Sequence, residues 1–249
     1  MYYQRNNAPF GRNNQMFGSS RYQYQTLPYG YEGTQASGLI GKVMGLLAFS
    51  FLFATIGTFI GSQVIHSVGS FWIVAIAGFV VLFILNFAIQ KPGLNLFLLY
   101  LFTFLEGMSL SPLISYYLVT QQSNILGEAF LITTLTSFGL AFYAWTTKRD
   151  FSRLADYLFF GLILLIVTSL IGIFFGGLFH TTLFSLLIAF FGVAIFSGYV
   201  LYYVQRAKYM ANTLPNAIGL TVSLFITVLN LFIYILEILS TMQGGRNRQ

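Results

Sequence analysis

From about residue 40 onward the chain alternates long apolar runs with short polar segments. Crossing a bilayer as a helix takes about 20 mainly apolar residues, and seven of the runs are long enough. We predict membrane-spanning helices at residues 40–64, 70–90, 94–119, 125–147, 157–179, 182–205 and 216–240. The pattern therefore predicts an all-α membrane protein with one seven-helix membrane domain over residues 39–241.

The two ends of the chain are polar. Residues 1–38 are rich in Asn, Gln, Tyr, Gly and Ser, which predicts a disordered tail, and residues 242–249 form a second, short polar tail. No apolar stretch lies within the first 30 residues, so we expect no cleaved signal peptide. The long tail is either a docking or degradation handle for a cytoplasmic partner or a solvated leader without a specific role.

Composition excludes a soluble fold. The 249 residues are 57% hydrophobic and only 7% charged, whereas soluble domains have roughly 25% charged residues. The net charge of +6 is scattered over short segments and forms no dense basic stripe, so we expect the lipid bilayer as partner and no nucleic acid. Because the chain has no cysteine, a disulfide, a thiolate metal site and a cysteine nucleophile are all excluded.

The basic residues predict the orientation. Ten of the twelve lie in the first tail or its adjoining helix turn and in the segments after the second, fourth and sixth spans: Arg5, Arg12, Arg21, Lys42, Lys91, Lys148, Arg149, Arg153, Arg206 and Lys208. Cytoplasmic segments carry an excess of Lys and Arg. We therefore expect a protein of the cell (inner) membrane with its N-terminus in the cytoplasm and its C-terminus outside.

The last span carries a polar stripe. Its members recur at steps of four and three residues, which brings them to one helix face: Ser223, Thr227, Asn230, Tyr234, Glu237 and Thr241. Polar groups do not face hydrocarbon without a partner, so this face is expected to turn inward. It lines either an ion path or binding cavity, or a set of interhelical hydrogen bonds.

Glu106 is the acidic residue nearest the middle of a span, roughly 18 Å along its helix. A carboxyl at this depth is costly and by default functional. It is a candidate to bind a cation or relay a proton, the alternative being a hydrogen bond to a neighbouring Tyr, Ser or Thr. Gly107 and Pro112 on the same helix favour a bend.

Three pairs of glycines have the spacing that lets membrane helices approach closely. They are Gly41 with Gly45 and Gly57 with Gly61 on the first span, and Gly172 with Gly176 on the fifth. We interpret these pairs as packing positions.

Catalytic chemistry is not indicated. The two histidines, His66 and His180, lie in turns on the predicted outer side and form neither a Ser-His pair nor a zinc cluster in the sequence. We expect no enzyme, no catalytic residue and no cofactor, and the sequence assigns no metal ligands.

Four motifs occur in order along the chain: 104–112 (FLEGMSLSP), 147–152 (TKRDFS), 196–202 (FSGYVLY), and 222–225 (VSLF) with 230–232 (NLF). Together they resemble the Bax inhibitor-1 family, also called transmembrane Bax inhibitor motif-containing proteins. The resemblance implies a seven-helix fold whose last helix is central and surrounded by the other six. It also implies pH-sensitive calcium leak and suppression of cell death or membrane stress, and a bacterial branch interacts with a membrane-bound AAA protease.

One departure from the family concerns mechanism. Calcium-leak members carry two Asp residues, on the sixth and seventh helices, that pair as a pH sensor, and this chain has Tyr203 and Thr227 there. Two carboxyls in one site titrate together because like charges repel, and Tyr with Thr does not reproduce this near neutral pH. The family's calcium and pH chemistry is therefore an open question for this chain.

Two functions follow from these observations. The first is a calcium or cation leak channel or transporter that affects ion homeostasis and stress survival, with Ca²⁺ as cargo. Its path or sensor residues would be Glu106, Ser223, Thr227, Asn230, Tyr203 and Glu237, and the 147–152 motif would form a cytoplasmic gate with Lys148, Arg149 and Asp150. The alternative is a non-conducting regulator that binds a membrane partner such as an AAA protease.

Overall fold

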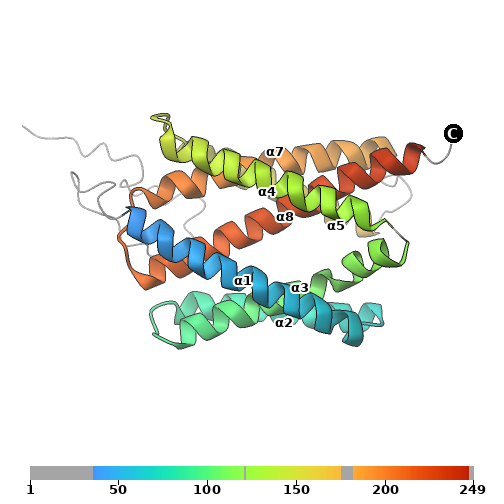
Figure 1. The fold of residues 1–249 in the computed structure, drawn as a ribbon, viewed down its shortest axis with the longest axis horizontal. Helices are drawn as coiled ribbons and strands as arrows, with labels where there is room; N and C mark the ends of the chain where they lie inside the picture. The colour runs from blue at the N-terminus through green and yellow to red at the C-terminus, as the bar shows by residue number, and fades with distance from the viewer. Residues whose placement is uncertain (1–35, 121, 175–181, 247–249) are drawn as a thin grey trace, which may run out of the picture. The chain divides into compact units, whose positions relative to one another are not determined.

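The computed structural model describes residues 36–120, 122–174 and 182–246, and across these residues the chain forms seven α-helices and no strand (Figure 1). The helices are α1 (Ala36–Val64), α2 (Val68–Ala88), α3 (Leu94–Val119), α4 (Ser123–Thr146), α5 (Leu154–Phe174), α7 (Thr182–Ala207) and α8 (Leu214–Arg246). All seven are long and apolar enough to cross a membrane. The fold class predicted from the sequence is confirmed.

The predicted spans agree with the helices to within a few residues, and the differences lie at the ends. α1 begins at Ala36, inside the predicted tail, and α8 continues to Arg246, so the first residues of the predicted C-terminal tail are helical. The rest of the N-terminal tail, residues 1–35, lies outside the described residues, as does the predicted end of the fifth span at residue 179.

Local signals explain several helix starts. Ser67 and Ser70 cap α2 reciprocally: the Ser67 hydroxyl accepts the Ser70 N–H at 3.1 Å and the Ser70 hydroxyl accepts the Ser67 N–H at 3.2 Å. Gly93 precedes α3 with φ of 77°, a conformation that favours glycine. At α8 the Thr213 hydroxyl accepts the Asn216 N–H at 3.4 Å, and Pro215 sits in the first turn, where its missing N–H costs nothing.

The described chain divides into two compact units, and each is described by itself. The α1–α3 unit contains α1, α2, α3 and residues 207–225, which include the first part of α8. The α4–α7 unit contains α4, α5, α7 up to Arg206 and the second part of α8 from Ile226.

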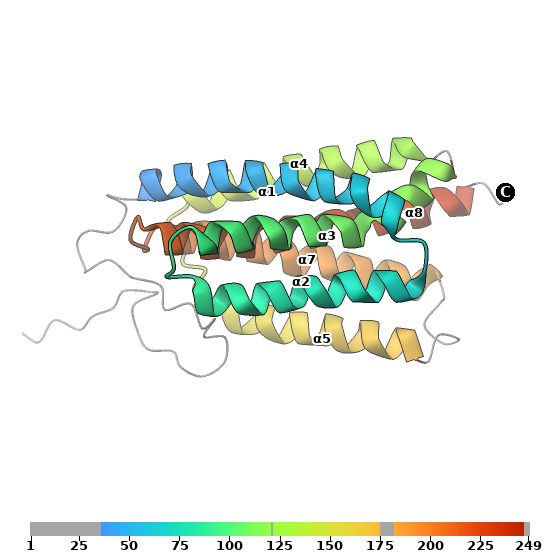
Figure 2. The ribbon, with the colours of Figure 1, turned by 90° about the horizontal axis from the view of Figure 1, so that it is seen from below.

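In the α1–α3 unit, α3 packs against both other helices and lies between them (Figure 2). Phe225, from the first part of α8, is fully buried and packs its ring against Phe51 of α1 and Phe102 of α3, at centroid distances of 5.2 and 6.1 Å. On α1 and α3, Phe53 stacks on Tyr100 at 4.9 Å. Aromatic contacts of this kind fill the interior of the unit.

Small residues bring α1 and α3 into backbone contact. A Cβ at Gly57 would overlap the carbonyl of Phe104, and a Cβ at Gly107 would overlap the backbone of Ala54. One turn further on, a Cβ at Gly61 would lie 2.6 Å from the Ser111 hydroxyl. The packing interpretation therefore holds for Gly57 and Gly61.

The other two glycine pairs differ. Gly41, Gly45 and Gly172 have no atom of another segment within 4 Å of where a Cβ would be, so they do not mediate close approach. Gly176 lies outside the described residues. Spacing alone identified the small positions but not which of them meet another helix.

In the α4–α7 unit, glycines again accept large neighbours. Ile195 of α7 covers Gly161 of α5, and Leu158 of α5 covers Gly198 of α7. On the α8 side of α7, the ring of Tyr234 lies over Gly192, where a Cβ would come within 2.6 Å, and stacks on Phe196 at 5.8 Å. α7 thus contacts α5 and the second part of α8.

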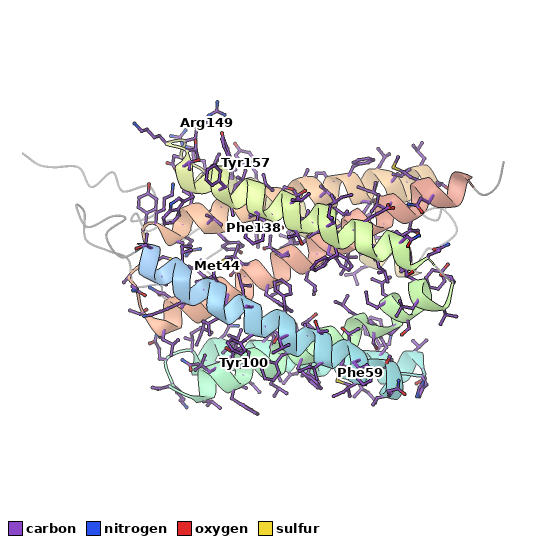
Figure 3. All side chains as sticks on the ribbon, in the orientation of Figure 1. Met44, Phe59, Tyr100, Phe138, Arg149 and Tyr157 are labelled. Atoms are coloured by element: carbon purple, nitrogen blue, oxygen red, sulfur yellow. The ribbon has the colours of Figure 1, made fainter. Side chains whose placement is uncertain are left out.

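The outward faces are apolar, as a lipid environment requires. Six of the described helices expose several large hydrophobic side chains, among them Phe59 and Phe138, which are labelled in Figure 3. α8 is different: between residues 214 and 243 its one exposed side chain is Met242. Most of the described part of α8 is therefore shielded from the surroundings.

Candidate functional site

Glu106 lies in the middle of α3, on the side of that helix that faces α2. Its Oε1 is 3.5 Å from the position of a Cβ on the buried Gly78, an ordinary van der Waals distance, so the carboxyl lies beside the backbone of α2 at this position. The side chain is partly buried. Within the described part of the chain it has no hydrogen-bond or ion-pair partner, which leaves the carboxyl available to a cation or a proton.

The adjacent residue anchors this part of α3. Gly107 touches the backbone of α1, and its carbonyl accepts a hydrogen bond from the Thr58 hydroxyl at 2.9 Å. Pro112 has no N–H, so the carbonyl of Met108 loses its usual helical donor. Contact with α1 therefore fixes the rotation of α3 and directs Glu106 toward α2.

The polar stripe of α8 is formed as the sequence predicts, and most of its donors find acceptors within the helix. The Ser223, Asn230 and Thr241 side chains donate to the carbonyls of Gly219, Ile226 and Glu237, at 3.0, 2.8 and 2.7 Å. Each acceptor is four residues earlier on α8. These hydrogen bonds use the hydroxyl donors of Ser223 and Thr241 and one of the two N–H groups of Asn230 without a second helix.

Aromatic side chains surround the position where calcium-leak members carry the first Asp. Tyr203 of α7 stacks on Tyr199 at 5.6 Å and meets Tyr202 edge-on at 5.2 Å. Thr227, at the position of the second Asp, is 3% exposed on α8. The first position therefore belongs to an aromatic cluster, and neither position carries a carboxyl.

The other acidic residues of the helices are Glu237, Glu128 and Asp156, the last of which is exposed in the first turn of α5. Glu237 is partly buried on α8, one turn after Tyr234, and its carboxyl has no hydrogen-bond partner among the described residues. Glu128 of α4 accepts a hydrogen bond from the Gln243 side chain at 3.2 Å, at an exposed position. Glu237 therefore resembles Glu106 in lacking a donor, and Glu128 does not.

The six predicted path residues fall into two sets. Glu106 and Ser223 belong to the α1–α3 unit, and Thr227, Asn230, Tyr203 and Glu237 belong to the α4–α7 unit. Within the second set, Thr227, Asn230 and Glu237 follow one another on one face of α8. In the described ranges, no three His, Asp or Glu side chains gather into a group that could hold a metal ion.

The 147–152 motif forms an ordered loop between α4 and α5. Lys148, Arg149 and Asp150 are all exposed on it. Inside the loop, the Asp150 carboxylate accepts the Ser152 N–H at 2.8 Å and the Thr147 hydroxyl accepts the Arg149 N–H at 3.3 Å. These short-range bonds give the loop its turn conformation just before α5 begins.

Gln205, near the end of α7, is a structural residue that the sequence analysis did not single out. It is 3% exposed; its Oε1 accepts the Phe151 N–H at 2.6 Å and its Nε2 donates to the Arg149 carbonyl. A single amide thus holds two backbone groups of the loop. The available signal was a polar amide at the end of an apolar run, which here needs partners outside its own helix.

Neither histidine belongs to a site in the described chain. The ring Nε2 of His66 lies 2.8 Å from the Gln63 carbonyl at the exposed end of α1, and His180 lies outside the described residues. No residue was predicted to be catalytic, and the absence of enzymatic activity stays a prediction.

A profile of the family described as "Inhibitor of apoptosis-promoting Bax1" matches residues 36–244, which include all four motifs and all seven helices but the last residues of α8. The chain belongs to the Bax inhibitor-1 family. The family predicted from the motifs is thereby confirmed. As a Bax inhibitor-1 family member with seven apolar helices, the protein is a multi-pass membrane protein.

Curated relatives cover most of the chain. An uncharacterized Campylobacter jejuni protein is 34% identical over 223 residues, which is 86% of this chain and 94% of its own length. An uncharacterized membrane protein of Vibrio cholerae is 35% identical over 147 residues, or 59% of this chain and 63% of its own. The Golgi anti-apoptotic protein of vaccinia virus (strain Lister) is 29% identical over 210 residues, which is 80% of this chain and 83% of its own length.

Proposed function

We propose that this Bax inhibitor-1 family protein is a leak channel or transporter for cations, with Ca²⁺ as the first candidate cargo and Glu106 as the ion-binding carboxyl. The observation that carries the proposal is the geometry of Glu106. It lies mid-span, partly buried against Gly78, and no described group donates to it. An intramembrane carboxyl without a protein partner is suited to exchange a proton for a cation.

The polar face of α8 supports a path for the ion. Ser223 and Asn230 each donate a side-chain hydrogen bond to a carbonyl of α8, and both side chains also carry an oxygen. Oxygen ligands suit Ca²⁺. Thr227, Tyr203 and Glu237 extend the proposed path or sensor. The proposed cytoplasmic gate consists of Lys148, Arg149 and Asp150, on the loop between α4 and α5 that Gln205 holds.

The absence of the acidic pair changes the expected pH response. With Tyr203 and Thr227 in place of two Asp residues, no coupled carboxyl pair controls opening. Flux is expected to follow the titration of single carboxyls, Glu106 first and Glu237 second. This function would contribute to ion homeostasis and survival of membrane stress.

We further propose the cell membrane as the location, with the N-terminus cytoplasmic and the C-terminus outside. The basic loop supports this orientation, because Lys148, Arg149 and Arg153 are exposed where α4 and α5 meet. Cysteines introduced one at a time at Lys148 and Gln243 and labelled with an impermeant thiol reagent in intact cells would test it. Labelling at residue 148 but not at 243 would contradict the orientation.

Calcium flux into proteoliposomes tests the proposed activity. The purified protein is compared with Glu106→Gln at acidic and alkaline pH, and Glu128→Gln serves as the matched control because its carboxyl is exposed and already hydrogen-bonded. We expect flux in the wild type and in Glu128→Gln, and a loss of at least about tenfold in Glu106→Gln, on the order of one lost charge-assisted ligand. Equal flux in all three proteins would remove Glu106 from the mechanism.

A regulator that does not conduct is the second candidate, and the aromatic cluster around Tyr203 favours it. Such a protein would bind a membrane partner, for example an AAA protease, through helix faces or the N-terminal tail. A silent wild type that gains flux only as Tyr203→Asp/Thr227→Asp would support this candidate over the first. Partner capture that survives deletion of residues 1–38 would exclude the tail as the binding element.

A further inference from the structure

The loop between α4 and α5 is a surface segment held at two points. Gln205 of α7 binds the Phe151 N–H and the Arg149 carbonyl, and the Phe151 ring packs against Tyr143 of α4 at 6.1 Å. Loops are generally more mobile than the helices they connect, and contacts of this kind restrain the backbone. This loop therefore presents its outward side chains from a defined backbone.

Three basic side chains project from the loop without a protein partner. Lys148, Arg149 and Arg153 are exposed, and their charged groups form no ion pair or hydrogen bond with any residue that the structure describes. Two acids are nearby in the sequence, Asp150 and Asp156, both exposed. Asp150 accepts the Ser152 N–H, and neither acid pairs with the three bases in the described chain.

The surroundings of the loop are those of a membrane boundary. Tyr143 and Trp145 are exposed on the last turn of α4, and Tyr157 is 75% exposed on the first turn of α5. Tyr and Trp gather where a membrane-spanning helix reaches the headgroup layer. Figure 3 shows Arg149 and Tyr157 at the same end of this unit, both pointing outward.

We propose that the held loop is a binding site for the headgroup of an anionic phospholipid, with Lys148, Arg149 and Arg153 around the phosphate. The charges are complementary, and the guanidinium groups suit the geometry of phosphate oxygens. Exposed aromatic rings on both flanking helices favour a lipid over an acidic protein, because they fit the acyl-chain boundary beside the headgroup. The proposal does not depend on ion conduction.

The fluorescence of Trp145, beside the loop, can report which lipid lies next to it. In the full-length Trp72→Phe variant Trp145 is the one remaining tryptophan of the chain. The protein is reconstituted in phosphatidylcholine vesicles that contain a small fraction of phosphatidylglycerol or of phosphatidylcholine with brominated chains, which quench nearby indole fluorescence. We expect brominated phosphatidylglycerol to reach half-maximal quenching at a several-fold lower fraction than brominated phosphatidylcholine.

Two variants locate the effect. In the triple variant Lys148→Gln/Arg149→Gln/Arg153→Gln, brominated phosphatidylglycerol and brominated phosphatidylcholine should quench alike. Each base is expected to contribute up to about fivefold to the preference for phosphatidylglycerol, which is the order of magnitude for one basic residue at an anionic surface. Lys91→Gln removes another exposed base, from the turn between α2 and α3, and should keep the preference. Circular dichroism and gel filtration check that each variant is folded.

Three results would overturn the proposal. Equal quenching by the two lipids in the parent protein would remove the lipid site and favour a protein partner for the loop. Equal loss in Lys91→Gln would show a diffuse charge effect. A preference abolished by inorganic phosphate at constant ionic strength would assign the loop to free phosphate instead of a lipid.

Discussion

Helices α3 and α8 both carry polar residues inside their spans, and they differ in what those residues bind. On α8, the side chains of Ser223, Asn230 and Thr241 donate to carbonyls of the same helix. On α3, the Glu106 carboxyl has no partner among the described residues. Short hydroxyl and amide side chains can reach a carbonyl four residues back, whereas a carboxylate needs donors, and mid-helix N–H groups are already used.

The comparison teaches which polar groups in a span are available for chemistry. A donor side chain can be satisfied by its own helix, so a polar stripe is not by itself a path. An acceptor-only group such as a carboxylate depends on another helix, water or an ion. Glu237 of α8 follows the same rule, since its carboxyl also has no described partner.

The largest expected effect comes from breaking the contact that orients Glu106. In Gly107→Ala the new Cβ overlaps the backbone of Ala54, which cannot move aside as a flexible side chain could. We expect a loss of about 3 kcal/mol in the free energy of unfolding, at the upper end for overpacking, measured by denaturant titration in mixed micelles. Gly41→Ala is the control, with open space at its Cβ, and an equal loss there would refute the assigned contact.

An intermediate effect is expected at Gln205, a polar side chain whose two ends are both used. Gln205→Leu leaves the Phe151 N–H and the Arg149 carbonyl without their described side-chain partner. We expect about 2 kcal/mol of destabilisation, since each unsatisfied buried group costs about 1–3 kcal/mol and water reaches part of this loop. Faster hydrogen exchange at Phe151 would be the direct readout, and unchanged exchange would show that Gln205 does not hold the loop.

The smallest effect is expected on the α8 stripe. In Asn230→Leu the lost hydrogen bond is one to a carbonyl of the same helix, and the shape of the side chain is retained. The free energy of unfolding should fall by less than about 1 kcal/mol, near the average for polar contacts in membrane helices. A loss several times larger, in the same micelle titration, would mean that Asn230 bonds a second helix.

Much of the fold could be predicted from the sequence because membrane spans are long and uninterrupted. Partners across space were harder. The same four-residue spacing marks Gly41 with Gly45 and Gly57 with Gly61, yet only the second pair meets α3, since spacing reports small residues and not what packs on them. Gln205 was missed because its partners are backbone groups more than 50 residues away along the chain.

The candidate site was also predicted only in part, because the sequence shows positions along a helix and not the partners that packing brings to them. The mid-span depth of Glu106 follows from counting residues, but the position of its carboxyl beside Gly78 of α2 depends on how the helices pack. The face shared by Thr227, Asn230 and Glu237 follows from helical periodicity, whereas the acceptors of the α8 donors depend on side-chain rotamers. The sequence showed that Tyr203 replaces an Asp of the calcium-leak members, but it did not predict that the Tyr203 ring stacks on Tyr199.

The central claim is that Glu106 is the carboxyl free to exchange a proton for a cation, and infrared difference spectroscopy on the reconstituted protein tests it most directly. Adding Ca²⁺ should remove a protonated-carboxyl band and produce a carboxylate band. This signal should vanish in Glu106→Gln and persist in Glu128→Gln, and Glu237→Gln shows whether the second unpartnered carboxyl adds to it. A Ca²⁺-induced signal that is unchanged in Glu106→Gln would contradict the account.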